Sequence, residues 1–315
     1  MNSPKPFRLA LAQTLCSILP PFFAQSLRSW VYPARLAYRD DYSFEVKAQT
    51  GSLFRGHTRD IHAYPFSVHG YYEWRIWAIA RAVCLKGDTI LEVGSNIGTE
   101  TIAFSDIVGP EGRVYAFEPV PANLAGLRLN FASKTNVSIM PYAAGRTERE
   151  IKFILPPEGA MSGIGYAANT QNEAGEEGIK IPCKRLDSFP DIQKLKLICI
   201  DAEGSEVDIL AGAEGLLEHF KPFLICEYNE KLLKRSGLKG RDLREIIERF
   251  NYKIFEINRW GMAALNEKMT TGSNWFCAHD SNLSSIKKIR KIIFSCGILP
   301  LWSKSNPLAP HSKAL

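Results

Sequence analysis

Two acidic residues and two glycines form the pattern in this 315-residue chain that is best suited to chemistry. Glu92 lies near the end of an apolar run, and Gly94 and Gly98 follow in a short polar turn. Glycine permits the positive φ of a tight turn and lets the backbone come close to a ligand. Glu118 closes a second apolar run roughly 20 residues later, where an acid in an open parallel sheet can bind ribose hydroxyls. The spacing therefore predicts a nucleoside-binding site.

The same spacing indicates which nucleoside. A dinucleotide fingerprint needs three glycines as G-x-G-x-x-G, but Ser95 and Asn96 follow Gly94, so the middle glycine is missing. The charge of Glu92 would repel a pyrophosphate and attract an ammonium group. The pattern resembles that of class I S-adenosylmethionine-dependent methyltransferases. We therefore expect Glu92 and the turn to face the methionine part and Glu118 to bind the ribose. The alternative is an ordinary βα turn with solvated acids.

A second acidic motif follows the apolar run 195–200. Asp201 is expected at the carboxyl end of a strand beside the first one, where Asp201 and Glu203 suit a sulfonium and an acceptor that loses a proton. The alternative is a helix N-terminus, whose dipole acidic residues complement. Asp201 is the first candidate for a general base. His69 is the second, although a buried structural histidine is the favoured interpretation of this residue.

The elements that position these residues alternate between strands and helices. Strands are expected at residues 89–93, 113–117, 137–141, 195–200, 222–226, 252–257 and 274–278, the last antiparallel. Helices are expected at 71–84, from 99 onward, and at 121–133, 206–219 and 240–250. This order predicts an α/β fold, a doubly wound Rossmann-like sheet of seven strands with a helical N-terminal extension.

Three parts are expected along the chain: a helical and hairpin extension at 1–69, the main domain at 70–280, and a basic amphipathic tail at 281–315. The hairpin is expected between 44–49 and 52–57. The uncharged run 9–27, interrupted by two prolines, predicts a helix packed on the domain or on a surface, rather than an export signal or a membrane span.

Two further segments are predicted to have roles outside the sheet itself. Residues 151–155 and 179–182 are expected to pair as a hairpin, and their glycine-rich connection is expected to be a lid over the acceptor pocket. The basic amphipathic stretch 286–294 is either a docking helix or a contact with an anionic membrane surface.

The composition agrees with a cytoplasmic enzyme that has peripheral membrane contact at most. Apolar residues make up 45% of the chain and charged residues 23%, as in globular proteins. The net charge of +6 gives no case for nucleic acid. The seven cysteines are dispersed without a C-x-x-C pair, so neither a metal centre nor a disulfide framework is expected.

These motifs together resemble the FkbM-type methyltransferase family over residues 70–257. The elements that carry the resemblance are Gly70–Glu73, Glu92–Gly98, Ala116–Pro119, Ile200–Gly204 and Leu210–Ala213. The resemblance implies S-adenosylmethionine-dependent O-methylation of a hydroxyl on a sugar, saccharide or other secondary metabolite. The chain departs from the family in two places, because Ser95 replaces an alanine and Cys199 replaces a common lysine.

The expected site follows from the motifs and the resemblance. The cofactor-binding residues are Glu73, Glu92, Gly94, Asn96, Gly98, Glu118, Ala143 and Asp201. The catalytic candidates are Asp201 and His69, and no metal site is predicted, although convergence of Asp201, Glu203 and Glu227 would permit one. Two other functions stay open: a nicotinamide-dependent oxidoreductase on the same fold, and a non-catalytic nucleoside-binding module.

Overall fold

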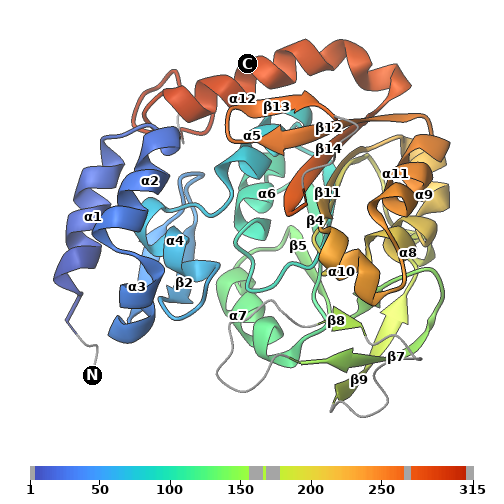
Figure 1. The fold of residues 1–315 in the computed structure, drawn as a ribbon, viewed down its shortest axis with the longest axis horizontal. Helices are drawn as coiled ribbons and strands as arrows, with labels where there is room; N and C mark the ends of the chain where they lie inside the picture. Colours follow the sequence, from blue (N-terminus) through green and yellow to red (C-terminus); the bar gives the residue numbers. More distant parts are fainter. Residues whose placement is uncertain (1–3, 156–165, 168–177, 266–270, 310–315) are drawn as a thin grey trace.

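An eight-stranded sheet forms the centre of the computed structural model, which describes residues 4–155, 166–167, 178–265 and 271–309 (Figure 1). The strand order is β13-β12-β14-β11-β10-β3-β4-β5. The strands are β3 (Thr89–Val93), β4 (Arg113–Phe117), β5 (Val137–Met140), β10 (Leu195–Ile200), β11 (Phe223–Tyr228), β12 (Tyr252–Asn258), β13 (Gly261–Ala264) and β14 (Ser273–His279).

All seven predicted strands are confirmed, and β14 is antiparallel to both of its neighbours, as expected. The structure adds an eighth strand, because β13 pairs with β12 in a hairpin. The sequence of β13, Gly-Met-Ala-Ala, has no β-branched or aromatic residue and so gave no strand signal.

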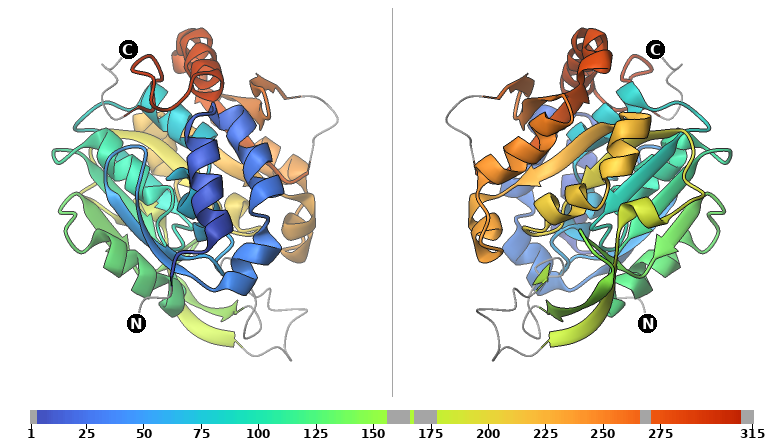
Figure 2. Two further views of the ribbon diagram at one scale, coloured as in Figure 1. Left: turned by 90° about the vertical axis from the view of Figure 1, so that its left-hand side faces the viewer. Right: turned by 90° about the vertical axis from the view of Figure 1, so that its right-hand side faces the viewer.

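Helices cover both faces of this sheet (Figures 1 and 2). The helices are α5 (Trp74–Val83), α6 (Thr101–Val108), α7 (Pro121–Phe131), α8 (Glu206–Ala211), α9 (Glu214–Phe220), α10 (Glu230–Arg235), α11 (Gly240–Arg249) and α12 (Ile286–Ile298), with 3-10 turns at Leu186–Ser188 and Asp280–Ser285. The helix expected at 206–219 is two helices. It breaks at Gly212, where a Cβ would lie 2.1 Å from the Gly145 carbonyl oxygen.

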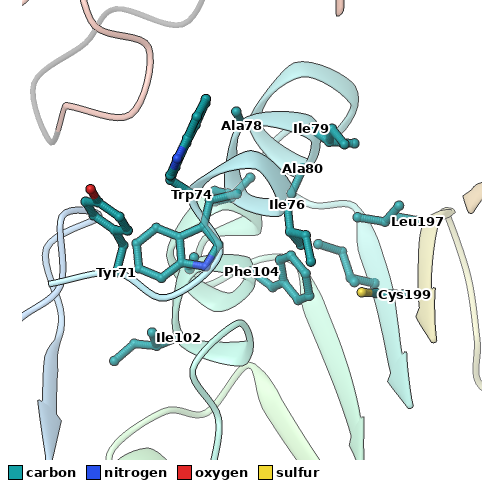
Figure 3. Close-up of a cluster of buried hydrophobic side chains, with 14 of the residues drawn as sticks. Tyr71, Trp74, Ile76, Ala78, Ile79, Ala80, Ile102, Phe104, Leu197 and Cys199 are labelled. Carbon is teal, nitrogen blue, oxygen red and sulfur yellow. The ribbon is translucent and has the colours of Figure 1, made fainter. Parts of the chain in front are cut away.

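Side chains of each central strand alternate between two cores, one on each face of the sheet. Leu197 and Cys199 of β10 belong to the core under α5 and α6, which Figure 3 shows in close-up. Ile198 and Ile200 belong to the core under α8, α9 and α11. Burial on both faces explains why the strand sequence is a continuous apolar run rather than an alternating one.

A smaller sheet lies beside the first one, with the order β6-β9-β7-β8. Its strands are β6 (Ala143–Ala144), β7 (Arg149–Ile154), β8 (Tyr166–Ala167) and β9 (Gly178–Lys184). Pairing of Ile151 with Ile181 confirms the predicted hairpin. The lid expected in its connection falls on residues 156–165 and 168–177, which are outside the described residues.

The N-terminal elements pack on one another and on the main sheet's helices (Figure 2). They are α1 (Phe7–Ser17), α2 (Pro21–Val31), α3 (Ala34–Asp40), β1 (Ser43–Lys47), β2 (Leu53–His57) and α4 (Ala63–His69). The run 9–27 forms two helices that meet at Pro20, and Leu9 and Ala12 are fully buried among α2 and α4. The expected hairpin is present, with Ser43 opposite His57.

The C-terminal helix α12 lies along the top of the molecule in Figure 1, across α5 and β13. Its buried side chains, among them Ile289, Ile293 and Cys296, join the core under α5. In the described part of the chain, no helix is both long enough and apolar enough to span a bilayer. The division at residues 69 and 280 stays a prediction.

Candidate functional site

A cavity opens at the carboxyl ends of three neighbouring strands, β10, β3 and β4. The sheet changes its direction of growth here, because β4 and β5 extend it to one side of β3 while β10 and β11 extend it to the other. Such switch points are where open α/β sheets bind ligands. The smaller sheet contributes one wall of the cavity, and His62 and Tyr72 contribute another from the N-terminal part of the chain.

The turn after β3 is tied to both neighbouring strands through the backbone. The N–H groups of Gly94 and Ser95 both donate to the Phe117 carbonyl, at 3.0 Å each. The N–H of Asp201 donates to the Val93 carbonyl at 2.9 Å. Gly94 has φ +88°, and a Cβ there would lie 1.8 Å from the Asp201 carbonyl oxygen. Only glycine allows the turn to approach the end of β10 this closely.

Glu118, directly after β4, presents an oriented carboxylate to the cavity. One oxygen accepts from the Asn96 N–H at 2.8 Å, and the other accepts from the Val120 N–H at 2.8 Å and from Asn123 Nδ2 at 3.3 Å. Burial raises the pKa of Glu118, whereas these three donors lower it. A carboxylate offers about four acceptor positions, so it retains capacity for a ligand hydroxyl.

Asp201 and Glu227 lie side by side at the ends of the neighbouring parallel strands β10 and β11, because the residues before them, Ile200 and Cys226, are paired. The Asp201 side chain is open to the cavity, but the surrounding protein removes it from bulk water and raises its pKa, while His62 and Glu227 lower it. Burial, followed by the charge of Asp201, raises the pKa of Glu227 to about 9. At neutral pH Glu227 is therefore protonated.

The cavity is lined by acidic side chains and by no basic lysine or arginine among the described residues. Four acids line it: Glu100, Glu118, Asp201 and Glu203. Burial raises the pKa of Glu100 well above its usual range and that of Glu203 to about 7. An acidic cleft with apolar walls concentrates cations, so it suits a ligand that carries positive charge.

His62 is held at the cavity by three contacts. Its Nδ1 lies 2.6 Å from Asn96 Nδ2, and its ring meets the Tyr72 ring edge-on, with centroids 5.1 Å apart. Its backbone N–H donates to Asp60 Oδ1 at 2.8 Å. The sequence gave no signal for His62. Tyr72 was within reach, because it belongs to the Gly70–Glu73 element that was expected to border the pocket.

The structure brings five of the predicted site residues to this cavity: Gly94, Asn96, Glu118, Ala143 and Asp201. Glu92 is not among the lining residues. Strand alternation turns its side chain toward α6, where its carboxylate accepts from the Thr101 hydroxyl at 2.6 Å. Burial raises the pKa of Glu92 to about 8.

Two more predicted residues, Glu73 and Gly98, do not line the cavity either. Glu73 lies behind Glu100, whose carboxylate accepts its backbone N–H at 3.3 Å. Gly98 faces the ring of Phe131, which a Cβ would approach to 2.3 Å. Both positions therefore support the cavity from outside.

His69 lies at a separate cavity, which it lines with Gln49, Trp302 and others. Its ring stacks on Tyr71 with centroids 4.8 Å apart, and its Nε2 has no hydrogen-bond partner. Burial lowers the pKa of His69 well below its usual range, so the ring is neutral. The structure supports the structural alternative for this histidine, because α4 ends with His69 turned away from the strand ends.

The lining residues fit S-adenosylmethionine. The acidic walls suit its sulfonium and ammonium groups, and Glu118 can accept a ribose hydroxyl. Asn96 is 8% exposed, and its Oδ1 has no hydrogen-bond partner, so it can still accept from a ligand. Within the described ranges no group of three or more His, Cys, Asp or Glu side chains is arranged as metal ligands.

Comparison with known proteins agrees with this site. The profile of the methyltransferase FkbM domain matches residues 92–254, just over half of the chain. Methyltransferase 1 of Beauveria bassiana is 24% identical over 151 residues, which cover 42% of this chain and 59% of that protein, less than two thirds of its length.

The names of two further relatives bear on the acceptor, since one states a hexuronic acid and the other a 2-O position. The hexuronic acid methyltransferase AglP of Haloferax volcanii is 26% identical over 182 residues, covering 55% of this chain and 68% of AglP. The 2-O-methyltransferase NoeI of Sinorhizobium fredii is 24% identical over 176 residues, covering 51% of this chain and 71% of NoeI.

The α/β sheet and the cavity at its switch point define a Rossmann-like methyltransferase fold. With the match over residues 92–254, the chain belongs to the FkbM methyltransferase family. Its methyl donor is S-adenosylmethionine.

The contact between Gly94 and the end of β10 predicts a stability loss that a matched glycine can isolate. Gly94 and Gly87 both have φ +88°, but a Cβ at Gly87 meets nothing within 4 Å. Gly87→Ala should therefore show only the backbone strain, about 1–2 kcal/mol. Gly94→Ala should lose at least twice as much, since it also collides with the Asp201 carbonyl. Urea unfolding of both variants measures the difference in the free energy of unfolding. Equal losses of stability would show that the turn can move away from the Asp201 carbonyl without cost.

The proton on Glu227 predicts how stability depends on pH. Its pKa is about 9 in the folded protein against an ordinary value of 4.5. Between these values the folded state holds a proton that the unfolded state has lost, so the free energy of unfolding falls as the pH rises. Glu227→Gln should flatten this decline between pH 5.5 and 8.5, measured by urea unfolding. Glu218→Gln, at an exposed acid, is the control and should keep the wild-type slope.

Proposed function

We propose that this protein transfers a methyl group from S-adenosylmethionine to a hydroxyl group of a saccharide. The observation that carries the proposal is the acidic cavity, in which Glu118 and Asp201 face the same space from the ends of β4 and β10. Glu118 is on the side of the turn that suits the ribose, and Asp201 is on the side that remains for the acceptor. The name of AglP, which states a hexuronic acid, supports a saccharide as the acceptor, and that of NoeI, a 2-O-methyltransferase, supports transfer to oxygen.

Bound S-adenosylmethionine supplies an electrophilic methyl group on a sulfonium. The protein's task is then to hold an acceptor oxygen about 3 Å from that carbon and in line with the bond that breaks. The Asp201 carboxyl faces the side of the cavity that remains for the acceptor, where its oxygen atoms can orient the acceptor by a hydrogen bond. Phe153 and Ile151 of β7 supply an apolar wall on the other side.

We also propose a site for the peripheral membrane contact that the sequence suggests. The exposed stripe of α12 carries Lys287, Arg290 and Lys291, and Phe294 at 52% and Ile298 at 44% exposure follow on the same helix face. Cations beside large apolar side chains suit an anionic membrane surface.

The role of Glu118 predicts a loss of donor affinity. Glu118→Gln keeps the shape of the side chain but removes the charge that strengthens a hydrogen bond to a ribose hydroxyl, worth about 1.5–3 kcal/mol. The dissociation constant for S-adenosylmethionine should rise at least about tenfold in calorimetry. Glu203→Gln removes a carboxyl from the same cavity without touching the turn, and its effect should be smaller. An unchanged affinity in folded Glu118→Gln would exclude the ribose assignment.

The acceptor and the role of Asp201 are tested together. Methyl-labelled S-adenosylmethionine is incubated with hexuronate-containing oligosaccharides, neutral oligosaccharides and polyketide alcohols, and we expect label on an oligosaccharide. Asp201→Asn should lower the rate about 10²-fold or more while changing donor affinity far less. Asp191→Asn, at an exposed aspartate, should transfer at the wild-type rate. Donor binding without transfer to any acceptor would favour the non-catalytic nucleoside-binding module.

A further inference from the structure

One titratable group at the cavity has no part in the function proposed so far. His62 is the only histidine among the described residues that line the cavity, and an imidazole is a common general base. It comes from the segment before α4, outside the residues 92–254 that match the family profile. It is half-buried, and the Asp60 side chain fixes its backbone by accepting the N–H groups of His62 and Ala63 at 2.8 and 2.9 Å.

Asn96 connects this histidine to the donor site. Its backbone N–H donates to Glu118 at 2.8 Å, and its side-chain nitrogen lies 2.6 Å from His62 Nδ1. Asn96 has φ +48°, a left-handed conformation that asparagine tolerates better than most residues. Because of this left-handed conformation, the backbone N–H of Asn96 points toward Glu118, the acid expected to bind the ribose. The side chain of Asn96 points toward the imidazole of His62.

The Asn96 amide can serve the imidazole in both protonation states. With Nδ2 toward the ring, the amide donates to a neutral imidazole whose proton is on Nε2. After half a turn of the amide, Oδ1 would accept from Nδ1–H, either of the imidazolium or of the tautomer in which Nε2 is the acceptor. Oδ1 has no other partner in the structure, so nothing opposes that turn. His62 can thus gain a proton without losing its neighbour.

Acidic side chains at the cavity can stabilise an imidazolium at His62. Asp201 lines the same cavity, and its attraction to His62 partly opposes the rise in the pKa of Asp201 that burial causes. Glu100, Glu118 and Glu203 line the same space. The remaining close neighbour is Tyr72, whose phenol stays neutral because burial raises its pKa. Of the described residues at the cavity, no cation opposes an imidazolium.

We propose that His62 is a catalytic residue that accepts the proton of the acceptor hydroxyl, while Asp201 stabilises the resulting imidazolium. This inference rests on the proposed O-methylation. The acceptor oxygen forms its bond to the methyl carbon as the carbon–sulfur bond breaks and its electron pair stays on sulfur. The hydroxyl proton passes to Nε2 of neutral His62, in the tautomer whose Nδ1–H donates to Asn96 Oδ1. The imidazolium later returns this proton to water, so the site is restored without another reactant.

The kinetic test compares pH profiles with the acceptor that the wild-type protein methylates. His62→Gln should lower kcat about 10²-fold or more and remove the acid limb of the profile that a neutral histidine requires. Donor affinity by calorimetry should change less than about threefold, because Glu118 and the turn remain intact. His219→Gln, at an exposed histidine on α9, should match the wild type in both respects. A His62→Gln protein with the wild-type rate and profile would overturn the proposal.

A second measurement needs neither an acceptor nor a change at residue 62. Nitrogen-15 NMR follows the protonation of each imidazole, and Asp201→Asn should move the midpoint of the His62 titration to lower pH while leaving that of His219 unchanged. An unmoved His62 midpoint would overturn the pairing with Asp201. If the wild-type protein methylates no saccharide, the proposed function is wrong. If the wild type and His62→Gln methylate a saccharide at equal rates, only the proposed role of His62 is wrong.

Discussion

The close packing of the turn after β3 against the ends of β4 and β10 is the constraint on which the cavity depends. Two N–H groups of the turn share the Phe117 carbonyl, and Gly94 leaves no space for a Cβ beside the Asp201 carbonyl. These contacts set the positions of Glu118 and Asp201 relative to each other, since each follows a strand that the turn touches. The site is therefore built from backbone contacts that any substitution with a side chain at Gly94 would disturb.

The second physical feature is the number of carboxyl groups removed from bulk water at one sheet edge. Glu92, Glu203, Glu206 and Glu227 all have pKa values raised by burial, to between about 7 and about 9. Such burial costs stability unless the groups are protonated or satisfied by donors. A cationic ligand would offset that cost, which gives a physical reason why an acidic cavity and a sulfonium cosubstrate belong together. It also means that ligand binding and proton uptake are linked at this edge.

The N-terminal part of the chain completes the cavity. His62 and Tyr72 precede the residues that match the family profile, yet they line the same space as Asp201. Their position depends on the packing of α4 against the β1–β2 hairpin and α1, which holds the segment next to the strand ends. In this protein the fold supplies the donor-binding geometry, while the preceding segment shapes the side on which we place the acceptor.

The sequence by itself determined the sheet, the turn and the acids at the strand ends. Apolar runs bounded by glycine and acidic residues predicted all seven strands, and strand ends of a parallel sheet meet at one edge, so Gly94, Asn96, Glu118 and Asp201 could be grouped before any contact was known. Tertiary structure alone decided which neighbours reach that edge. Strand alternation turned Glu92 to the helix α6, the fold of α4 took His69 to another cavity, and His62 arrived through contacts distant in sequence. A linear pattern encodes which face a residue takes within its own element, but not which face of a distant element packs against it.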